Sequence, residues 1–315
     1  MKTIRNISKK PAAFQRIFGV SLKQFDLLVA KFKIEWDITE KERLGREKRQ
    51  RKIGGGHPYS LQLIEEKLLL ILMYYKAYPT QELLGFLFDI DQSNVSRLFR
   101  KIMPLLEKAA DPSLRSYLKK AKETADQERI SSLEQLTKKF PELRDVSTDA
   151  TEQECYRSSN YEIQKKYYSG KSKSHTIKTQ ISVSKEGKIL DVSNSYPGSV
   201  HDKAIIDQEK TVQKFSKIVP QRFDSGYQGL VAQNPEYYLI LPIKKPRGGE
   251  LTRLEKEINT ANSKRRVIAE HGFSRAKKFK IMGSRFRNRS TTHNTIFRGI
   301  AAILNFRLEN QLIPA

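Results

Sequence analysis

The stretch that decides the fold is residues 176–193, TIKTQISVSKEGKILDVS. Its first half alternates with the two-residue period of a β-strand. One face carries Ile177, Thr179, Ile181 and Val183, and the other carries Lys178, Gln180 and Ser182. Residues 185–187, Lys-Glu-Gly, supply a turn, and residues 188–193 return as a second strand. The stretch therefore predicts a pair of adjacent strands.

Further elements surround this pair on both sides. Residues 146–151 are rich in β-formers, and residues 217–223 and 237–243 have the length and apolar content of further strands. Helices are expected after Ser199 and over residues 262–280 and 294–311. Three strands, a helix, a strand and closing helices are typical of a ribonuclease-H-like α/β domain, with a mixed sheet and flanking helices. We expect this domain over residues 141–315.

The N-terminal part has the helical period instead. Residues 12–36 carry apolar positions at helical spacing, with a helix end and a new start at residues 18–21. Residues 60–110 predict three helices, with Thr80 and Ser93 as N-caps, and residues 114–140 add a polar helical stretch. We expect a helical region and linker over residues 1–56 and an all-α helix-turn-helix domain over residues 57–140.

The third of these helices has two different faces. Val95, Leu98, Phe99, Ile102 and Leu106 form an apolar stripe, and Asn94, Arg97 and Lys101 follow the opposite face. A short helix, a tight turn and a helix with a basic, amide-bearing face are typical of DNA-binding helix-turn-helix units. A plain helical bundle has the same pattern. The overall charge favours the DNA-binding interpretation.

Composition excludes several classes of protein. The 315 residues include 59 Lys and Arg against 35 Asp and Glu, a net charge of +24. An excess of this size indicates an anionic partner, either nucleic acid or an anionic membrane surface. The longest apolar run, residues 68–75, is too short to span a bilayer, and residues 1–20 lack the pattern of a signal peptide. Cys155 is the single cysteine, which excludes a disulfide framework and favours a reducing, cytoplasmic location.

A basic segment joins the two helical regions. Residues 41–52, KERLGREKRQRK, contain seven basic residues and two acidic ones, and three glycines follow at residues 54–56. This composition is typical of a flexible connector. A merely solvated linker and a segment that contacts DNA fit it equally well.

Three carboxylates stand out in this basic chain. Asp149 lies in the first predicted strand, Asp224 ends the fourth, and Glu270 lies in the helix over residues 262–280. Between residues 264 and 289 there are ten Lys or Arg residues, and Glu270 is the one acidic residue among them. Carboxylates from two strand ends and one helix suit Mg²⁺, and a pair of such ions is the usual device for attacking a phosphodiester. A surface salt bridge is the alternative for each carboxylate taken alone.

At these residues the chain resembles the DDE transposases of the bacterial insertion-sequence-five family, which are similar to Harbinger-type transposases. The matching segments are residues 14–27, 54–61 and 61–106, and the runs around Asp149, Asp224 and Glu270. The helix of Glu270 also resembles the signature Tyr-x2-Arg-x3-Glu-x6-Lys through Arg266 and Lys277, whereas Ser263 stands at the tyrosine position. Residues 197–202, PGSVHD, resemble a family segment whose aspartate, here Asp202, is counted among the metal ligands. Helix capping is the alternative role for Asp202, and His201 is expected to make local hydrogen bonds.

The resemblance implies a function. Asp149, Asp224 and Glu270 would be the catalytic residues and would hold two Mg²⁺ ions, which Mn²⁺ could replace, while Asp202 supports them. Asn94, Arg97, Lys101, Arg266 and Lys277 would contact double-stranded DNA at the terminal inverted repeats of the element. The enzyme would cleave there and join the freed 3′-hydroxyl to target DNA, acting as a homodimer or larger assembly at the bacterial nucleoid and not at a membrane. A domesticated regulator that binds without cleaving and a metal-dependent nuclease without strand transfer are the alternatives.

Overall fold

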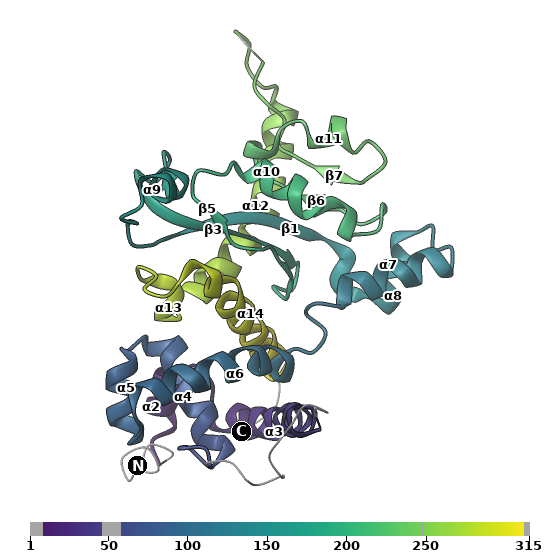
Figure 1. Ribbon diagram of the computed structural model, residues 1–315. Coiled ribbons are helices and arrows are strands. Elements are labelled where there is room, and N and C mark those ends of the chain that lie inside the picture. The colour runs from purple at the N-terminus through teal and green to yellow at the C-terminus, as the bar shows by residue number, and fades with distance from the viewer. Residues whose placement is uncertain (1–8, 46–57, 247, 312–315) are drawn as a thin grey trace. The chain divides into compact units, whose positions relative to one another are not determined.

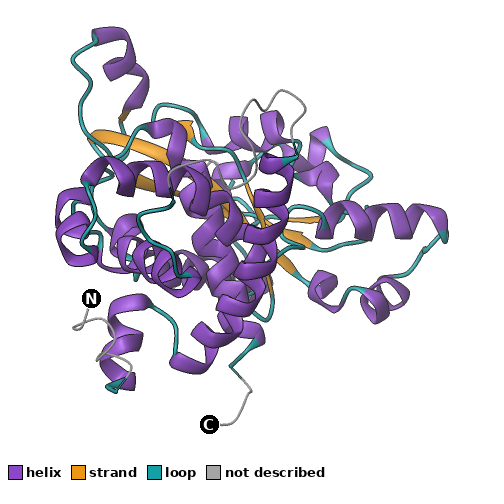
Figure 2. Cartoon of the chain, turned by 60° about the horizontal axis from the view of Figure 1, so that its bottom comes forward, coloured by secondary structure: helices purple, strands orange, loops and turns teal. Residues whose placement is uncertain are grey.

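The chain divides into two compact units. The computed structural model describes residues 9–45, 58–246 and 248–311. Unit 1 consists of Met1–Pro112, Lys277–Gly283 and Thr295–Ala315, and unit 2 consists of Ser113–Ala276 and Ser284–Asn294. All of the described strands, which are orange in Figure 2, lie between residues 146 and 240 and therefore in unit 2. Most of the predicted connector, residues 46–52, and the glycines at 54–56 lie outside the described residues.

Unit 1 is helical, and its helix ends follow from local sequence. Its helices are α2 (Pro11–Phe18), α3 (Leu22–Leu44), α4 (Ile64–Ala77), α5 (Gln81–Phe88), α6 (Gln92–Ala110), α13 (Lys280–Gly283) and nearly all of α14 (His293–Glu309). The break predicted at residues 18–21 is confirmed. Gly19 ends α2 with φ of +80°, a conformation that costs glycine little, and Ser21 and Gln24 form a reciprocal capping box at the start of α3.

Helices α4, α5 and α6 confirm the three predicted helices. The Thr80 side chain caps α5 by accepting a hydrogen bond from the backbone N–H of Leu83 at 3.1 Å. The predicted cap at Ser93 is wrong by two residues. Asp91 is the N-cap of α6, and its Oδ1 accepts from the backbone N–H of Ser93 at 2.7 Å. Aspartate at this position satisfies an otherwise unpaired N–H and complements the helix dipole.

Helix α14 completes the core of unit 1. Ile296, Phe297, Ile300 and Ile303 on this helix are buried. A side chain in place of Gly299 would lie 3.1 Å from the buried Tyr75 hydroxyl, so the small residue lets α14 approach α4 closely. A buried amide–carboxylate hydrogen bond of 2.7 Å joins Asn305 to Asp111 at the end of α6.

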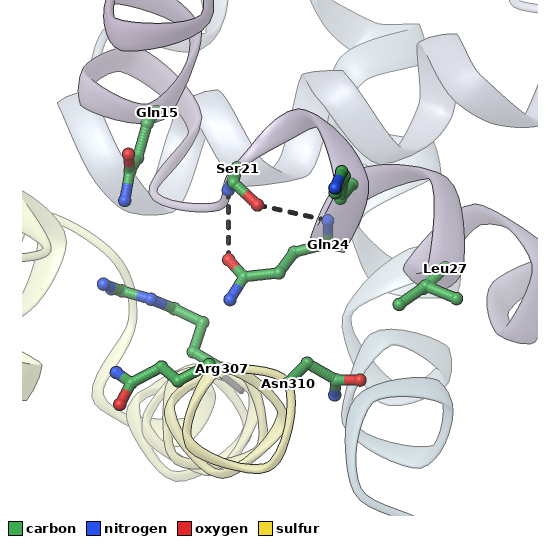
Figure 3. Close-up of a pocket in the computed structure, with 8 residues that line it drawn as sticks. Gln15, Ser21, Gln24, Leu27, Arg307 and Asn310 are labelled. Atoms are coloured by element: carbon green, nitrogen blue, oxygen red, sulfur yellow. Dashed lines mark hydrogen bonds between the residues drawn. The ribbon is translucent and has the colours of Figure 1, made fainter. Parts of the chain in front are cut away.

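A polar pocket opens on unit 1 beside the capping box. Its volume is about 180 Å³, and its lining comprises Gln15, Ser21, Lys23, Gln24, Leu27, Arg307, Asn310 and Gln311. Figure 3 shows the two hydrogen bonds between Ser21 and Gln24 at one side, and Arg307 of α14 and Asn310, which follows that helix, at the other. None of the residues predicted to act on DNA or metal lines this pocket.

Unit 2 is a mixed sheet with flanking helices. Its strands are β1 (Val146–Glu154), β2 (Tyr168–Ser169), β3 (Ser174–Ser184), β4 (Ile189–Val192), β5 (Tyr196–Pro197), β6 (Gln221–Arg222) and β7 (Leu239–Ile240). Its helices are α7 (Tyr117–Gln127), α8 (Leu133–Lys139), α9 (Tyr161–Tyr167), α10 (Asp202–Glu209), α11 (Leu230–Gln233) and α12 (Arg253–Lys277), of which the last residue belongs to unit 1. In Figure 1, α9 and the pair α7–α8 lie at opposite ends of β1.

Long strands β1 and β3 form the centre of the sheet. They pair antiparallel from Val146 with Ser184 to Glu154 with Thr176. β1 also pairs parallel with β6, which pairs parallel with β7, while β2, β4 and β5 pair antiparallel with β3. The predicted strands and helices are therefore present. The fourth and fifth strands are shorter than predicted, and β2, β5 and α9 were not predicted at all.

Both faces of β3 are covered. Ile181 and Val183 lie against α12, where a side chain at Gly272 would meet them at 3.1 and 3.3 Å. On the other face, Gln180 contacts the backbone of α10 at Asp202. The alternation predicted for β3 therefore separates an apolar face from a polar face, and both faces are buried.

The grouping of contacts differs from the predicted domain limits. Leu118, Ala121, Leu136 and Phe140 of residues 113–140 share a buried apolar cluster with Val146, Leu190, Phe215 and Val219. These helices therefore belong with the sheet rather than with the helix-turn-helix. Conversely, residues 277–283 and 295–315 belong with the N-terminal helices. Across the described ranges, no helix combines the length and the apolar character needed to cross a membrane.

Candidate active site

Parallel pairing of β1 and β6 brings two of the predicted carboxylates to one edge of the sheet. Ser147 pairs with Arg222, so Asp149 and Asp224 each follow this pair by two residues. Asp149 remains inside β1, whereas Asp224 follows the end of β6 and precedes a short 3-10 turn, Ser225–Tyr227. The side chain of Asp149 is 20% exposed and that of Asp224 is 43% exposed.

Helix α12 contributes the third carboxylate together with a cation. Arg266 and Glu270 are four residues apart and therefore lie on the same face of the helix. Nη2 of Arg266 lies 3.2 Å from Oε1 of Glu270, and Nη1 lies 3.4 Å from Oδ2 of Asp149. Nε of the same guanidinium lies 3.9 Å from Oδ1 of Asp224. Three acids that are 121 residues apart in sequence at their extremes (149 to 270) thus gather around one guanidinium.

Burial sets the protonation of Asp149. The pKa of this carboxyl is raised to about 6, chiefly by burial and to a smaller extent by the nearby carboxylates of Asp224 and Glu270. A hydrogen bond from the backbone N–H of Ala150 at 2.8 Å and the charge of Arg266 act in the opposite direction. Desolvation disfavours the charged form of a carboxyl, and a nearby cation offsets this cost. A cation beside Asp149 therefore stabilises the charged form of this carboxyl.

Asp202 lies in a neighbouring ion-pair network. Asp202 is the first residue of α10 and does not cap this helix. The N-cap is His201, whose side chain accepts a hydrogen bond from the backbone N–H of Lys203, in line with the local role expected for this histidine. Oδ1 of Asp202 lies 3.0 Å from Nζ of Lys178, which also lies 3.4 Å from Oε1 of Glu152. Neither of these two ion pairs involves the guanidinium of Arg266.

Tyr227 was missed by the sequence analysis as a site residue. Its hydroxyl accepts a hydrogen bond from Nε2 of Gln180 at 3.2 Å. Burial raises the pKa of this hydroxyl, and the charges of Asp149 and Asp202 raise it too, so Tyr227 stays protonated. The signal was present in the run Asp-Ser-Gly-Tyr at residues 224–227, but only the burial of the ring reveals its position.

The predicted recognition face of α6 is only partly free. Arg97 is exposed and donates to Oδ1 of Asn94 at 3.0 Å. Lys101 has partners within unit 1. Its Nζ forms an ion pair with Glu40, donates to the Tyr59 hydroxyl at 2.6 Å and lies 3.8 Å from the centre of the Trp36 ring. These contacts explain Lys101 as a structural cation that joins α6 to α3.

In the basic belt, residues 264–289, some basic side chains have partners within the protein and others are exposed. Arg265 pairs with Asp145 at 3.5 Å, Arg285 pairs with Glu154 at 3.3 Å, and Arg275 donates to the backbone carbonyl of Gly187. Lys277, the last residue of α12, is exposed.

The donor atoms suit a hard divalent cation, although a guanidinium lies among them. Carboxylate oxygens are the ligands that Mg²⁺ prefers, and three carboxylates here already surround a positive charge. Within the described residues, no three acidic, histidine or cysteine side chains lie close enough together to hold a metal ion as they stand. A divalent ion at this place therefore requires the Arg266 side chain to move out from between the carboxylates.

Comparisons with known proteins match both the helical N-terminal part and the part that contains the sheet. A family model described as "DDE superfamily endonuclease" matches residues 148–305, and one described as "Helix-turn-helix of DDE superfamily endonuclease" matches residues 59–112. The chain is also similar to the "Probable transposase for insertion sequence element IS702" of Microchaete diplosiphon. The two are 28% identical over 298 residues, which are 94% of each chain. No solved structure matches.

Proposed function

The chain belongs to the DDE superfamily endonucleases, and from this premise we propose that it is a DNA transposase that moves an insertion sequence. It would bind the terminal inverted repeats, cleave the element ends and join them to target DNA. The match to a probable transposase over 94% of both chains supports this proposal. So does the match of a helix-turn-helix model to residues 59–112. We also propose that the enzyme is related to the insertion-sequence-five and Harbinger-type transposases.

The gathering of Asp149, Asp224 and Glu270 around one guanidinium carries the proposal. Random surface salt bridges would not collect three acids from β1, from the end of β6 and from α12 at one point. In a chain with a net charge of +24, the same carboxylates would repel a DNA phosphate unless a cation lay between them. The cluster is therefore best explained as a cation site beside bound DNA.

We propose roles for the individual residues. Asp149, Asp224 and Glu270 would hold two Mg²⁺ or Mn²⁺ ions, with Asp202 in support. When bound, the ions would activate the attacking water or 3′-hydroxyl and stabilise the leaving oxygen. The guanidinium of Arg266, once released from the carboxylates, would donate to a DNA phosphate, which it fits as a planar fork.

DNA recognition is proposed for unit 1. Asn94 and Arg97 lie near the start of α6, where the recognition helix of a helix-turn-helix contacts base edges. Lys277 would contact the DNA backbone. Two element ends must be brought together, so we propose a homodimer or larger assembly on DNA. In unit 2 the strands follow the order β4-β3-β1-β6-β7. Strand β3 is antiparallel to both of its neighbours, β4 and β1, whereas β1, β6 and β7 are parallel. This arrangement supports a ribonuclease-H-like fold.

Cleavage of end DNA tests the proposal. Wild type and the Asp149→Asn variant would be incubated with labelled duplex carrying the inverted repeat and Mg²⁺, and binding would be measured by gel shift in parallel. We expect the wild type to nick and join, and the variant to bind normally without cutting. Asp207→Asn is the matched control because Asp207 is an exposed aspartate of unit 2 in α10.

Three outcomes would contradict parts of the proposal. Binding by wild type without cleavage in Mg²⁺ or Mn²⁺ would favour the regulator that binds without cleaving. Nicking without joining would favour the nuclease. Normal cutting by the Asp149→Asn variant would show that the site lies elsewhere.

A further inference from the structure

A surface of unusual composition lies on the segment between β1 and β3. We call residues 156–173, YRSSNYEIQKKYYSGKSK, the aromatic arm. Three of its four tyrosines, Tyr156, Tyr161 and Tyr168, are 61%, 68% and 46% exposed. Helix α9, in the middle of the arm, buries no residue at all. Tyr161 begins α9, Tyr156 precedes the helix with its ring 5.6 Å from the Arg285 guanidinium, and Tyr168 lies in β2. None of the three rings is buried in the core of unit 2, and exposed aromatic surface of this kind is typical of a binding site.

The arm also carries cations without acidic partners. Its five basic residues, all exposed, are Arg157, Lys165, Lys166, Lys171 and Lys173. Within the parts of the chain that the structure describes, none of the five forms an ion pair, in contrast to Arg265, Arg266 and Arg285 of the basic belt. Glu162 is the one acidic residue of the arm. The arm therefore presents a net positive, solvent-exposed surface to an anionic partner.

Several contacts hold the arm against the sheet. β2, within the arm, pairs with β3 through Tyr168 with His175 and Ser169 with Ser174. Glu152 of β1 accepts hydrogen bonds from Ser172 at 2.7 Å and from Thr176 at 2.8 Å. These bonds join the C-terminal end of the arm to the strands, so the residues that precede it project from an ordered base.

A glycine allows close packing at the same place. A side chain at Gly198 would lie 2.2 Å from the Thr176 hydroxyl and 2.8 Å from the backbone oxygen of Tyr167, the last residue of α9. The next residue, Ser199, donates its backbone N–H to the Lys166 carbonyl at 3.2 Å. The segment after β5 therefore supports the end of α9 through its backbone.

We propose that the aromatic arm binds unpaired nucleotides of the DNA substrate, with bases stacked on Tyr156 and Tyr161 and phosphates held by the lysines. The inference deepens the proposed function and rests on it. Exposed aromatic rings interleaved with cations are the combination that binds single strands, because every base has a face that stacks. Lysines alone would serve duplex DNA equally well, but duplex offers no free base faces to the tyrosines.

The position of the arm relative to Asp149 fits this role. β1 carries Asp149 near its middle and ends at Glu154, five residues further on. Five residues of strand span about 17 Å, which corresponds to roughly five nucleotides of stacked DNA at 3.4 Å each. Figure 1 shows α9 beyond this end of β1. The arm would therefore contact strands that open a few nucleotides from the cleaved bond.

The test compares single-stranded and duplex DNA. Fluorescence anisotropy would measure binding of a labelled oligothymidylate and of a blunt duplex to the full-length protein and to the variants Tyr161→Ala, Tyr161→Phe and Tyr156→Ala. We expect each alanine variant to lose roughly tenfold in affinity for the single strand. The Phe variant should retain it, and binding of blunt duplex should change less than twofold. Lys165→Gln with Lys166→Gln should weaken both and lower the salt dependence.

Each result decides the inference. Alanine variants that bind the single strand as tightly as wild type, or that lose the same factor on duplex, would overturn it. Because α9 buries nothing, these variants should fold, which circular dichroism would verify. Cleavage of end DNA by the wild type is measured in the same preparation. Normal cleavage with unaffected single-strand binding would remove the role of the arm and leave the proposed function intact.

Discussion

Replacing Arg266 with glutamine removes the cation that contacts all three carboxylates of the candidate site. Its guanidinium lies 3.2 to 3.9 Å from their oxygens. A pair of unit charges at such distances gains about 1 kcal/mol in water and about 4 kcal/mol near a partly buried surface. Glu270 and Asp224 are 51% and 43% exposed and lie near the lower value, whereas Asp149 lies higher. After the cost of desolvating the guanidinium, we expect the substitution to destabilise unit 2 by about 2 kcal/mol.

Thermal unfolding followed by circular dichroism, in EDTA and in millimolar Mg²⁺, measures this loss. In EDTA we expect the Arg266→Gln variant to melt roughly 4 to 8 °C below wild type. Mg²⁺ should raise the melting temperature of the variant more than that of wild type, because the ion no longer competes with the guanidinium for the carboxylates.

Arg265→Gln is the matched control for this experiment. Arg265 is the preceding residue, is 63% exposed and pairs with Asp145, which keeps its 2.7 Å ion pair with Arg222. Its loss should cost less than about 0.5 kcal/mol. The reasoning is refuted if the two variants melt alike in EDTA, or if Mg²⁺ stabilises wild type and Arg266→Gln equally.

Three further predictions concern single residues. Because the pKa of Asp149 is raised to about 6 in the folded protein, its contribution to stability is complete below about pH 4 and is lost as the pH rises through about 6. As the pH rises over this range, the free energy of unfolding of Asp149→Asn should therefore increase by roughly 2 to 3 kcal/mol relative to that of wild type, as measured by urea unfolding in EDTA. A difference that does not change with pH would contradict this prediction. Burial lowers the pKa of His293 to about 3, so stability should fall as the pH drops below about 6.5. His293→Gln should flatten this acid slope in the same titration. Arg97→Ala should weaken binding to end DNA in gel shifts without changing the melting temperature, whereas Lys101→Gln, which leaves Glu40 without its lysine, should destabilise unit 1 by about 1 to 3 kcal/mol. Equal effects of these two substitutions on melting would contradict the structural role of Lys101.

Local patterns predicted most of the elements because they act over short range. The alternation in residues 176–184 predicted β3, and the run around Gly19 and Ser21 predicted the end of α2 and the start of α3. Strands of two residues, such as β5 and β6, have no period of their own. They form because a neighbouring strand supplies hydrogen bonds, so their lengths could not be predicted from sequence alone.

The partners of Lys101 could not be predicted from the sequence for a similar reason. Helical spacing places Lys101 on the same face as Asn94 and Arg97, and in the structure its ammonium group lies against residues of α3. There Glu40 and Trp36 provide a charge and a ring for the ammonium group. A pattern within one helix contains no information about which helix packs beside it.

The sequence by itself determined three properties of this protein. The chain is strongly basic, a helical part precedes an α/β part, and three carboxylates stand out as candidate site residues. Those are properties of composition and of short periods, which each segment carries alone. Only the tertiary structure decided that Arg266 occupies the centre of the three carboxylates and that the buried Tyr227 hydroxyl accepts a hydrogen bond from Gln180. It also decided that Lys101 forms an ion pair with Glu40 within unit 1. The physical reason is that charges interact through distances in space, and pairing of β1 with β6 and packing of α12 set those distances between residues far apart in the chain.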